Sequence, residues 1–243
     1  MVTKRYFKQV RRFLFMTVLL CLVVSCENQL DNYDAPDGGI HGTVYDKQTE
    51  EPIPLPVEGN SGAMVSLYEK NVNATESVDF RARQDGTFVN GRVFNGDYRV
   101  VVAGPFVGVC EGDVRVSGQT EVALYAIPLS RITTEALIAE SNKLTVAYKV
   151  DKADESLDLS EIQLLWNITR GVDINTSNYA GKRSMGDEEE GSYVFDLESD
   201  KAFIENHYKI RNNGGKLYVR VAATVNGIVN YSKVMEITLN IDG

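Results

Sequence analysis

The sequence predicts an all-β chain of two consecutive β-sandwich domains. Short apolar alternations with a period of two recur from Ile40 onward, and Asn-Gly, Asp-Gly and Pro-rich turn signals separate them. Only residues 199–208 hint at a helical turn, with Ser199 as its N-cap. The 218 residues that follow a 25-residue leader are more than one small β module needs. We therefore expect domain 1 at residues 40–128 and domain 2 at residues 129–243.

Residues 1–25 have the three parts of a secretion signal. An apolar run from Phe13 to Val24 follows five basic residues, which are Lys4, Arg5, Lys8, Arg11 and Arg12. As a helix this run would reach only about 18 Å, well short of the ~30 Å hydrocarbon core, so it cannot span a bilayer. The segment LVVSC then looks like a bacterial lipobox, in which the small Ser25 precedes Cys26. We expect Cys26 to be lipidated and to become the membrane-anchored N-terminus of the mature protein.

Residues 26–39 are expected to form an acidic tether, because they have few apolar side chains and end in paired glycines. Lipidation of Cys26 would leave Cys110 as the single free thiol, so no internal disulfide can form and we expect Cys110 to be buried as a small apolar residue. Loss of the five basic residues lowers the formal net charge from −9 to −14. A chain this acidic, without a basic stripe, is not expected to bind nucleic acid, and its only membrane contact would be the lipid.

Five apolar alternations predict the strands of domain 1, at residues 40–46, 63–69, 97–103, 113–118 and 121–127. Asp85-Gly86 and Asn95-Gly96 stand where antiparallel hairpins need a positive φ. The Pro-rich segment at residues 50–62 cannot be a central strand, because each proline lacks an amide donor. We interpret it as a rigid connector, with a recognition loop as the alternative.

Two segments of domain 1 resemble the signatures of carboxypeptidase-regulatory-like, or transthyretin-like, modules of seven strands. The segments are GTVYDKQTEEPIP and DGTFVNGRVFNGDYRVVV, and the matching positions are Gly42, Val44, Asp46, Thr49, Pro52, Ile53, Asp85, Gly86, Phe88, Gly96 and Tyr98. We expect structural roles for them: Asp46 and Thr49 can hydrogen-bond the following turn, and Tyr98 can bury its ring while its hydroxyl stays in water. The resemblance covers residues 40–128.

A second series of alternations predicts another sandwich in domain 2, at residues 144–150, 161–169, 191–197, 216–225 and 234–241. A tryptophan within the second segment and a tyrosine near the start of the fourth are similar to those of fibronectin type III modules. We expect Trp166 in the core, with sugar stacking as the alternative. In the fourth segment we expect the odd-numbered residues, Leu217 to Val225, to face the core, opposite Tyr218, Arg220, Ala222 and Thr224.

The polar residues do not form a recognisable catalytic or metal-binding set. His41 and His207 are the only histidines, are expected at the surface, and belong to different domains. The acidic run at residues 187–190 is typical of a solvated loop rather than of the two opposed carboxylates of a glycosidase. Acidic residues at 151–158 have the oxygen ligands that calcium prefers, but they lack the central glycine and terminal glutamate of an EF-hand loop. We therefore expect no enzyme activity, no cofactor and no metal ion.

With LDNYDAPDG shortly after the lipobox, the whole chain resembles a family of two-domain Bacteroidetes outer-membrane lipoproteins of unknown function. The resemblance implies accessory work in glycan capture, in polysaccharide-utilisation systems that contain TonB-dependent transporters. We expect an outer-membrane lipoprotein, exposed at the surface rather than facing the periplasm, that binds glycan or transporter components. A structural or adhesive surface protein that binds other proteins is the alternative. Within the loop expected at residues 171–191, the candidate ligand-binding residues are Tyr179, Lys182 and Arg183.

Overall fold

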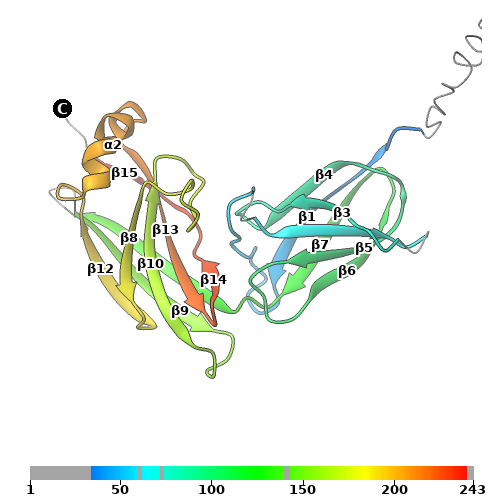
Figure 1. The fold of residues 1–243 in the computed structure, drawn as a ribbon, viewed down its shortest axis with the longest axis horizontal. Coiled ribbons are helices and arrows are strands. Elements are labelled where there is room, and N and C mark those ends of the chain that lie inside the picture. The colour runs from blue at the N-terminus through cyan, green and yellow to red at the C-terminus, as the bar shows by residue number, and fades with distance from the viewer. Residues whose placement is uncertain (1–33, 60–61, 72–73, 140–142, 240–243) are drawn as a thin grey trace, which may run out of the picture. The chain divides into compact units, whose positions relative to one another are not determined.

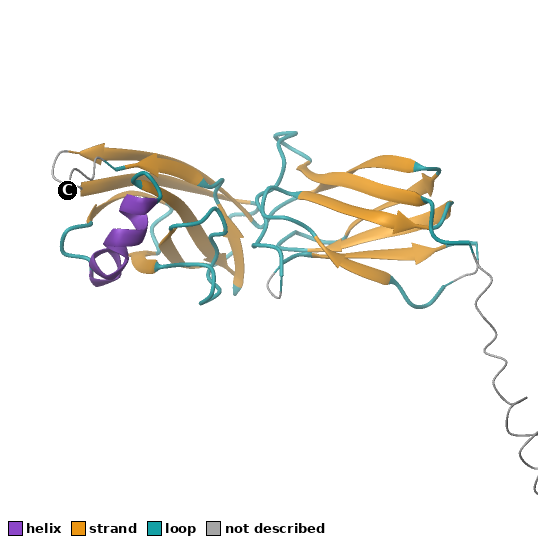
Figure 2. Ribbon diagram, turned by 90° about the horizontal axis from the view of Figure 1, so that it is seen from above, coloured by secondary structure: helices purple, strands orange, loops and turns teal. Residues whose placement is uncertain are grey.

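Figures 1 and 2 show the fold in a computed structural model, which describes residues 34–59, 62–71, 74–139 and 143–239. The leader and Cys26 lie outside the described residues, so lipidation stays a prediction. Over the described ranges, no helix is long and apolar enough to cross a membrane. The strands fall into two groups, one before and one after the short connection at residues 127–129. This arrangement confirms the prediction of an all-β chain with two domains.

The described residues of domain 1 form seven strands, the number that the transthyretin-like resemblance implies. One sheet has the order β4-β1-β7 and the other the order β3-β2-β5-β6. The strands are β1 (Gly38–Asp46), β2 (Met64–Glu69), β3 (Val78–Arg81), β4 (Thr87–Val93), β5 (Gly96–Ala103), β6 (Cys110–Val116) and β7 (Gln119–Ala126). Strand β1 begins two residues before Ile40, where the alternation begins.

One pairing differs from the antiparallel arrangement that we expected. Strands β1 and β7 pair in parallel, with partners that run from Gly39 and Gln119 to Asp46 and Ala126. These are the first and last strands of the domain, so no hairpin joins them and their directions are free of the constraint that a short turn imposes.

The two expected turn glycines behave differently. Gly86 has a φ of +85°, as predicted, and a Cβ there would lie 2.7 Å from the carbonyl oxygen of Ile53. Gly96 does not have a positive φ, so that part of the prediction is wrong. It is the first residue of β5 and pairs with Val116, because the chain already turns at residues 94–95. A Cβ at Gly96 would lie 3.0 Å from the amide nitrogen of the exposed Asn71 side chain, which would have to shift slightly to make room.

The core of domain 1 fills the space between its two sheets. Its fully buried residues include Ile40, Val44, Val65, Val100 and Cys110. Burial of Cys110 confirms the prediction, and it raises the pKa of the thiol to about 11. The ring of Tyr98 is also buried, but its hydroxyl donates a 2.9 Å hydrogen bond to the carbonyl oxygen of Phe94 instead of remaining in water. A backbone acceptor so close in sequence satisfies the hydroxyl inside the fold.

Domain 2 pairs a three-stranded sheet of order β12-β9-β8 with a wider sheet of order β11-β10-β13-β14, in which β15 pairs with the other end of β13. The elements are β8 (Ser130–Ala139), β9 (Lys143–Lys152), β10 (Leu159–Asn167), β11 (Gly181–Gly186), β12 (Glu190–Asp196), α2 (Lys201–Asn212), β13 (Lys216–Val225), β14 (Ile228–Tyr231) and β15 (Met235–Thr238). This two-sheet arrangement confirms the fibronectin-like prediction. Strands β8, β11 and β14 were not among the predicted alternations.

Helix α2 begins after Asp200 rather than Ser199, so the predicted N-cap is wrong by one residue. The Asp200 carboxylate accepts a 2.8 Å hydrogen bond from the Phe203 amide, whereas the Ser199 hydroxyl donates to the carbonyl oxygen of Asp196. A carboxylate is the stronger acceptor for the unpaired amides of the first turn and carries the charge that the helix N-terminus favours.

Trp166 lies in the core of domain 2, as predicted, with 1% of its surface exposed. Its ring packs edge-on against Phe203 from α2, with centroids 6.3 Å apart. Gly181 on β11 leaves room for the indole, because a Cβ there would collide with the ring nitrogen. Sugar stacking on Trp166 is therefore ruled out by its burial.

Strand β13 is buried on both faces, which the sequence did not predict. Its odd-numbered residues face the core as expected. On the opposite face, however, Arg220 and Ala222 are also buried, at 0% and 2% exposure. Segments of domain 1 and the loop after β10 contact this face, as described next.

Candidate binding cleft at the domain junction

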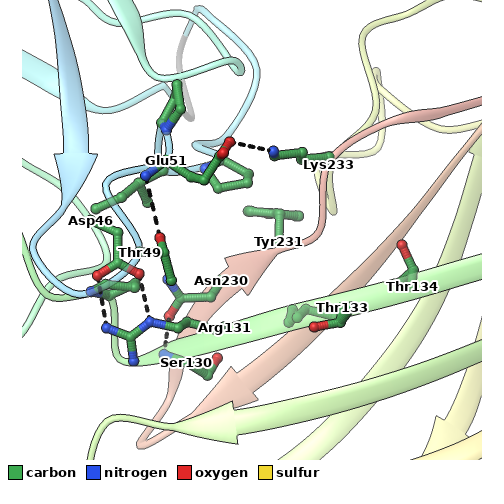
Figure 3. A pocket seen from close by; sticks show the side chains of 15 residues that line it. Asp46, Thr49, Glu51, Ser130, Arg131, Thr133, Thr134, Asn230, Tyr231 and Lys233 are labelled. Atoms are coloured by element: carbon green, nitrogen blue, oxygen red, sulfur yellow. Dashed lines mark hydrogen bonds and ion pairs between the residues drawn. The ribbon is translucent and has the colours of Figure 1, made fainter.

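The two domains meet where β7 leads into β8, and a cleft of about 320 Å³ opens there (Figure 3). Its lining combines charged, hydroxyl and apolar side chains from both domains. The charged residues are Asp46, Glu51, Arg131 and Lys233, and the hydroxyl-bearing ones include Thr49, Ser130, Thr133 and Thr134. The apolar and aromatic ones include Pro52, Pro54, Ile132 and Tyr231. The cleft lies within the size range of small-molecule binding sites.

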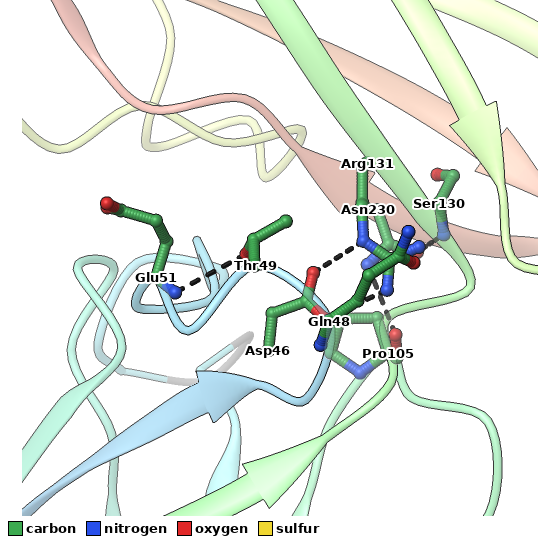
Figure 4. Close-up of polar contacts among 8 residues, drawn as sticks. All are labelled: Asp46, Gln48, Thr49, Glu51, Pro105, Ser130, Arg131 and Asn230. Carbon is green, nitrogen blue, oxygen red and sulfur yellow. Dashed lines mark hydrogen bonds and ion pairs between the residues drawn. The ribbon is translucent and has the colours of Figure 1, made fainter.

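One wall of the cleft is fixed by an ion pair between Asp46, at the end of β1, and Arg131, on β8. The guanidinium donates from Nε to Oδ2 at 2.5 Å and from Nη2 to Oδ1 at 2.8 Å (Figure 4). Burial of Asp46 opposes its ionisation, but hydrogen bonds from Arg131 and the Gln48 amide outweigh this effect and lower the pKa of the carboxyl. The predicted turn contacts also form, because Gln48 donates to Asp46 and the Glu51 amide donates to Thr49.

Asn230 joins the domains behind this ion pair. Its side-chain oxygen accepts from the Ser130 amide at 3.3 Å, and its side-chain nitrogen donates to the carbonyl oxygen of Pro105 at 3.1 Å (Figure 4). At 1% exposure, Asn230 satisfies two backbone groups that water could not reach. The connection between the domains is thus held on both sides of residues 127–129.

At the edge of the cleft, Lys233 donates to the Glu51 carboxylate at 2.8 Å (Figure 3). Both side chains are mostly exposed, at 68% and 62%, so this pair is screened by water and contributes little to stability. Glu51, Pro52, Pro54 and Lys233 also line a second cavity of about 710 Å³, together with Arg170 and Tyr218. The exposed ion pair therefore lies between two adjoining cavities.

Beneath the cleft, the buried Arg220 donates to four carbonyl oxygens: those of Ser232 at 2.8 Å, Val172 at 2.9 Å and Leu55 at 2.8 Å, and at a longer 3.5 Å that of Gln84. Its guanidinium lies 4.4 Å from the ring centroid of Tyr231. Burial lowers the pKa of Arg220 to about 10. Because Leu55 belongs to domain 1, this side chain ties the Pro-rich segment to β13.

A second contact fixes the same segment. The buried carboxylate of Asp173 accepts from the Val57 amide at 2.9 Å, and it also accepts from Asn175 and Asn178 of its own loop. On the neighbouring turn of domain 1, the Gln84 side chain donates to the carbonyl oxygen of Arg170 at 2.6 Å. The Pro-rich segment is thus a docking element between the domains.

The predicted binding residues Tyr179, Lys182 and Arg183 lie away from the cleft. Lys182 and Arg183 are on strand β11, so the single loop expected at residues 171–191 is wrong. The Lys182 ammonium lies 5.4 Å from the ring centroid of Tyr179, which brings these two together. Arg183 instead pairs with the N-cap Asp200 and lies over the Phe195 ring. Their role in ligand binding stays a prediction.

The cleft residues were missed as a site because they are distant in sequence. Asp46 was identified only as a turn residue, and its partner Arg131 lies 85 residues later. His41 and His207 are exposed on different domains, as predicted. Over the described residues, no group of three or more His, Cys, Asp or Glu side chains is placed to hold a metal ion. The cleft combines donors, acceptors and apolar surface, an arrangement suited to binding a small polar molecule.

The fold and the cleft define a two-domain β-sandwich protein with a ligand-sized site at the domain junction. The chain belongs to the two-domain DUF3823 family, because the "Protein of unknown function (DUF3823) N-terminal domain" matches residues 39–126 and the "Domain of unknown function (DUF3823_C)" matches residues 130–236. None of the curated proteins compared with the chain matches it.

Solved structures from Bacteroidetes have the same fold. A DUF3823 family protein from Parabacteroides merdae is 23% identical, with a TM-score of 0.69 over 84% of this chain and 100% of that one. A DUF3823 family protein from Bacteroides uniformis is 20% identical, with a TM-score of 0.63 over 84% and 100%. A candidate carbohydrate-binding protein from Bacteroides uniformis is 21% identical, with a TM-score of 0.62 over the same shares. At these identities the similarity establishes the fold.

Proposed function

We propose that the chain is a non-catalytic lipoprotein of the outer membrane that binds glycan in the junction cleft, as an accessory component of a transporter-associated polysaccharide-utilisation system. The observation that carries this proposal is the cleft itself, in which carboxylates, cations and hydroxyls line the same space as the apolar side chains of Pro52, Pro54 and Ile132. The structurally similar candidate carbohydrate-binding protein supports the class of ligand.

The chemistry of the cleft matches that of a sugar. Sugar hydroxyls both donate and accept hydrogen bonds, while the C–H faces of the ring are apolar. Glu51 offers acceptors and Lys233 offers donors on one side, and Thr133 offers a hydroxyl on another. Because Glu51 and Lys233 already pair, the edge of the cleft is close to electrically neutral, which favours an uncharged ligand.

Blocking the cleft tests the site. Thr133 is exposed on β8 and lines the cleft, so Thr133→Trp should fill it and weaken glycan binding by about tenfold or more, equivalent to about 1.4 kcal/mol. Thr238→Trp, at an exposed threonine on β15, is the matched control and should bind as the unaltered protein does. Retardation in gels that contain starch, xylan, mannan or dextran measures the affinity of residues 27–243. Equal binding by both variants would contradict the assignment of the cleft.

Membrane attachment is a separate part of the proposal and rests on the lipobox sequence before Cys26. Mass spectrometry of protein extracted from native membranes should find an acylated cysteine at the N-terminus. Cys26→Ala should leave the protein soluble or unprocessed. An unmodified Cys26 in the mature membrane form would contradict this part alone. Protease treatment of whole cells would then distinguish surface exposure from a periplasmic orientation.

One observation favours the alternative, a structural or adhesive protein. Helix α2 exposes Ile204 and Tyr208, at 58% and 61%, on one side of the helix. Apolar side chains in this arrangement are suited to contact with another protein. This alternative replaces glycan binding if three results are found together: no glycan binds, the transporter or another protein co-purifies with the chain, and Ile204→Ser abolishes that co-purification.

A further inference from the structure

The outer face of the sheet β4-β1-β7 carries two tyrosines side by side. Strands β1 and β7 pair in register, so Tyr45 lies opposite Tyr125, with ring centroids 5.7 Å apart and ring planes at 31°. The preceding residues, Val44 and Leu124, point into the core, and the alternation of a strand therefore directs both tyrosines outward. The pair belongs to domain 1 alone and lines neither junction cavity.

This face keeps apolar surface in contact with water. Tyr125 is 48% exposed, Val89 on β4 is 45% exposed, and Ile127 just beyond β7 is 37% exposed. Among the described residues, neither tyrosine hydroxyl forms a hydrogen bond with the protein. Tyr45 and Tyr125 therefore do not satisfy a buried polar group, and their hydroxyls are available to a ligand.

The neighbouring side chains narrow the chemistry of that ligand. Next to the rings along the two strands are Thr43 and Ala123, and Thr87 lies beside Thr43 on β4. The small Ala123 leaves space beside the Tyr125 ring, and Thr43 supplies a hydroxyl. The Thr87 hydroxyl, by contrast, already donates to the Asp85 carboxylate at 2.6 Å. A flat apolar surface with a hydrogen-bonding border is complementary to a pyranose ring, which has apolar C–H faces and hydroxyls around its edge.

Charge argues against the other ligands that stack on aromatic rings. A nucleobase carries phosphates, and proteins that stack single-stranded bases surround them with cations. Here the ionisable residues along the strands include a single cation just beyond Tyr45, Lys47, and the pair of His41 with Glu121, and the chain has a formal net charge of −9. An uncharged ligand avoids this repulsion.

We propose that Tyr45 and Tyr125 form a stacking platform for neutral pyranose units of a glycan, a second carbohydrate site apart from the junction cleft. The ligand class rests on the proposed function, but the residues do not, so the two proposals can fail separately. Two sites on one chain would raise avidity for a long polysaccharide over that for a short one.

The test compares ring removal with ring retention. The assay is retardation in gels containing starch, xylan, mannan or dextran. For whichever polysaccharide retards the unaltered protein, Tyr125→Ala and Tyr45→Ala should each lower the affinity by about tenfold, equivalent to about 1.4 kcal/mol. Tyr125→Phe keeps the ring and should lose much less affinity for the polysaccharide. Tyr208→Ala removes a comparably exposed tyrosine from α2 and should have no effect. Thermal unfolding of each variant checks that the fold is intact.

The pattern of results separates the two sites. Loss of retardation in Tyr125→Ala and Tyr45→Ala, with full retardation in Tyr208→Ala, supports the platform. Full retardation in both ring-removal variants, with loss in Thr133→Trp, would overturn the platform and leave the cleft. Loss of retardation in both ring-removal variants, with full retardation in Thr133→Trp, would overturn the cleft and leave the platform. No retardation of the unaltered protein by any of these polysaccharides would overturn both.

Discussion

Replacement of Arg220 by methionine should destabilise the protein strongly, because the guanidinium is fully buried and makes three hydrogen bonds of 2.8 to 2.9 Å to carbonyl oxygens. Hydrogen bonds from a charged group contribute about 2 kcal/mol each, or about 6 kcal/mol for three. Removing the charge also relieves the cost of burying it, which is several kcal/mol. The carbonyls of Ser232, Val172 and Leu55 then remain without this donor, and we expect a net loss of about 3 kcal/mol in the free energy of unfolding.

Urea unfolding of residues 27–243 measures this loss with one probe in each domain. Trp166 is the single tryptophan and reports on domain 2, while alkylation of Cys110 reports on domain 1. The unaltered protein should give coincident transitions, because Arg220 ties β13 to Leu55. Arg220→Met should lower the midpoint and separate the two transitions.

Two further variants make the result interpretable. Arg220→Lys keeps the charge but lacks the planar fork, and should lose about 2 kcal/mol. Arg115→Met, at an exposed position on β6, should change the stability by less than about 0.5 kcal/mol. If Arg220→Met behaves like Arg115→Met, the buried guanidinium does not stabilise the junction and the reasoning fails.

Three other predictions concern single residues. The pKa of Asp46 is lowered, so the ionised carboxylate stabilises the fold above the ordinary value of 3.8, and this effect is lost as the pH falls below that value. In thermal or urea unfolding, Asp46→Asn should therefore cost about 2 kcal/mol at pH 7 and progressively less toward pH 3. A constant difference across that range would contradict the ion pair. Cys110, with a pKa of about 11, should resist iodoacetamide at pH 8 in the native protein and react on unfolding; rapid native labelling would contradict its burial. Gly181→Ala should cost about 2 kcal/mol because its Cβ collides with Trp166, whereas Gly91→Ala, which meets no atom within 4 Å, should be nearly neutral. Equal stability of the two glycine variants would show that the indole can move aside.

The apolar alternations were enough to predict the two-domain fold and much of each core. Trp166 and the odd-numbered residues of β13 are buried as their pattern indicates. The same pattern placed Arg220 on a solvent face, because a period of two describes one buried face and contains no information on what covers the other. The covering segments are the Pro-rich segment and the loop at residues 171–175, which no local rule brings together with β13.

The binding cleft could not be predicted for the same reason. Its walls come from turns and strand ends of both domains, and each residue has an ordinary local explanation. Asp46 and Thr49 are good turn residues whether or not a cleft lies beside them. The sequence does supply one signal in retrospect: Arg131 stands at the start of a domain, where a cation after a short connection can reach back to the acidic end of β1.

The parallel pairing of β1 and β7 determines how domain 1 would respond to mechanical load. A tension between the residues before Gly38 and domain 2 pulls β1 from its first residue and β7 from its last, in opposite directions along neighbouring strands. The pairs from Gly39 with Gln119 to Asp46 with Ala126 are then sheared together, whereas a hairpin pulled open from its ends would lose its bonds one after another. If the proposed anchor at Cys26 and the proposed glycan binding in the junction cleft both hold, a pull on the glycan would load β1 and β7 in this shearing direction.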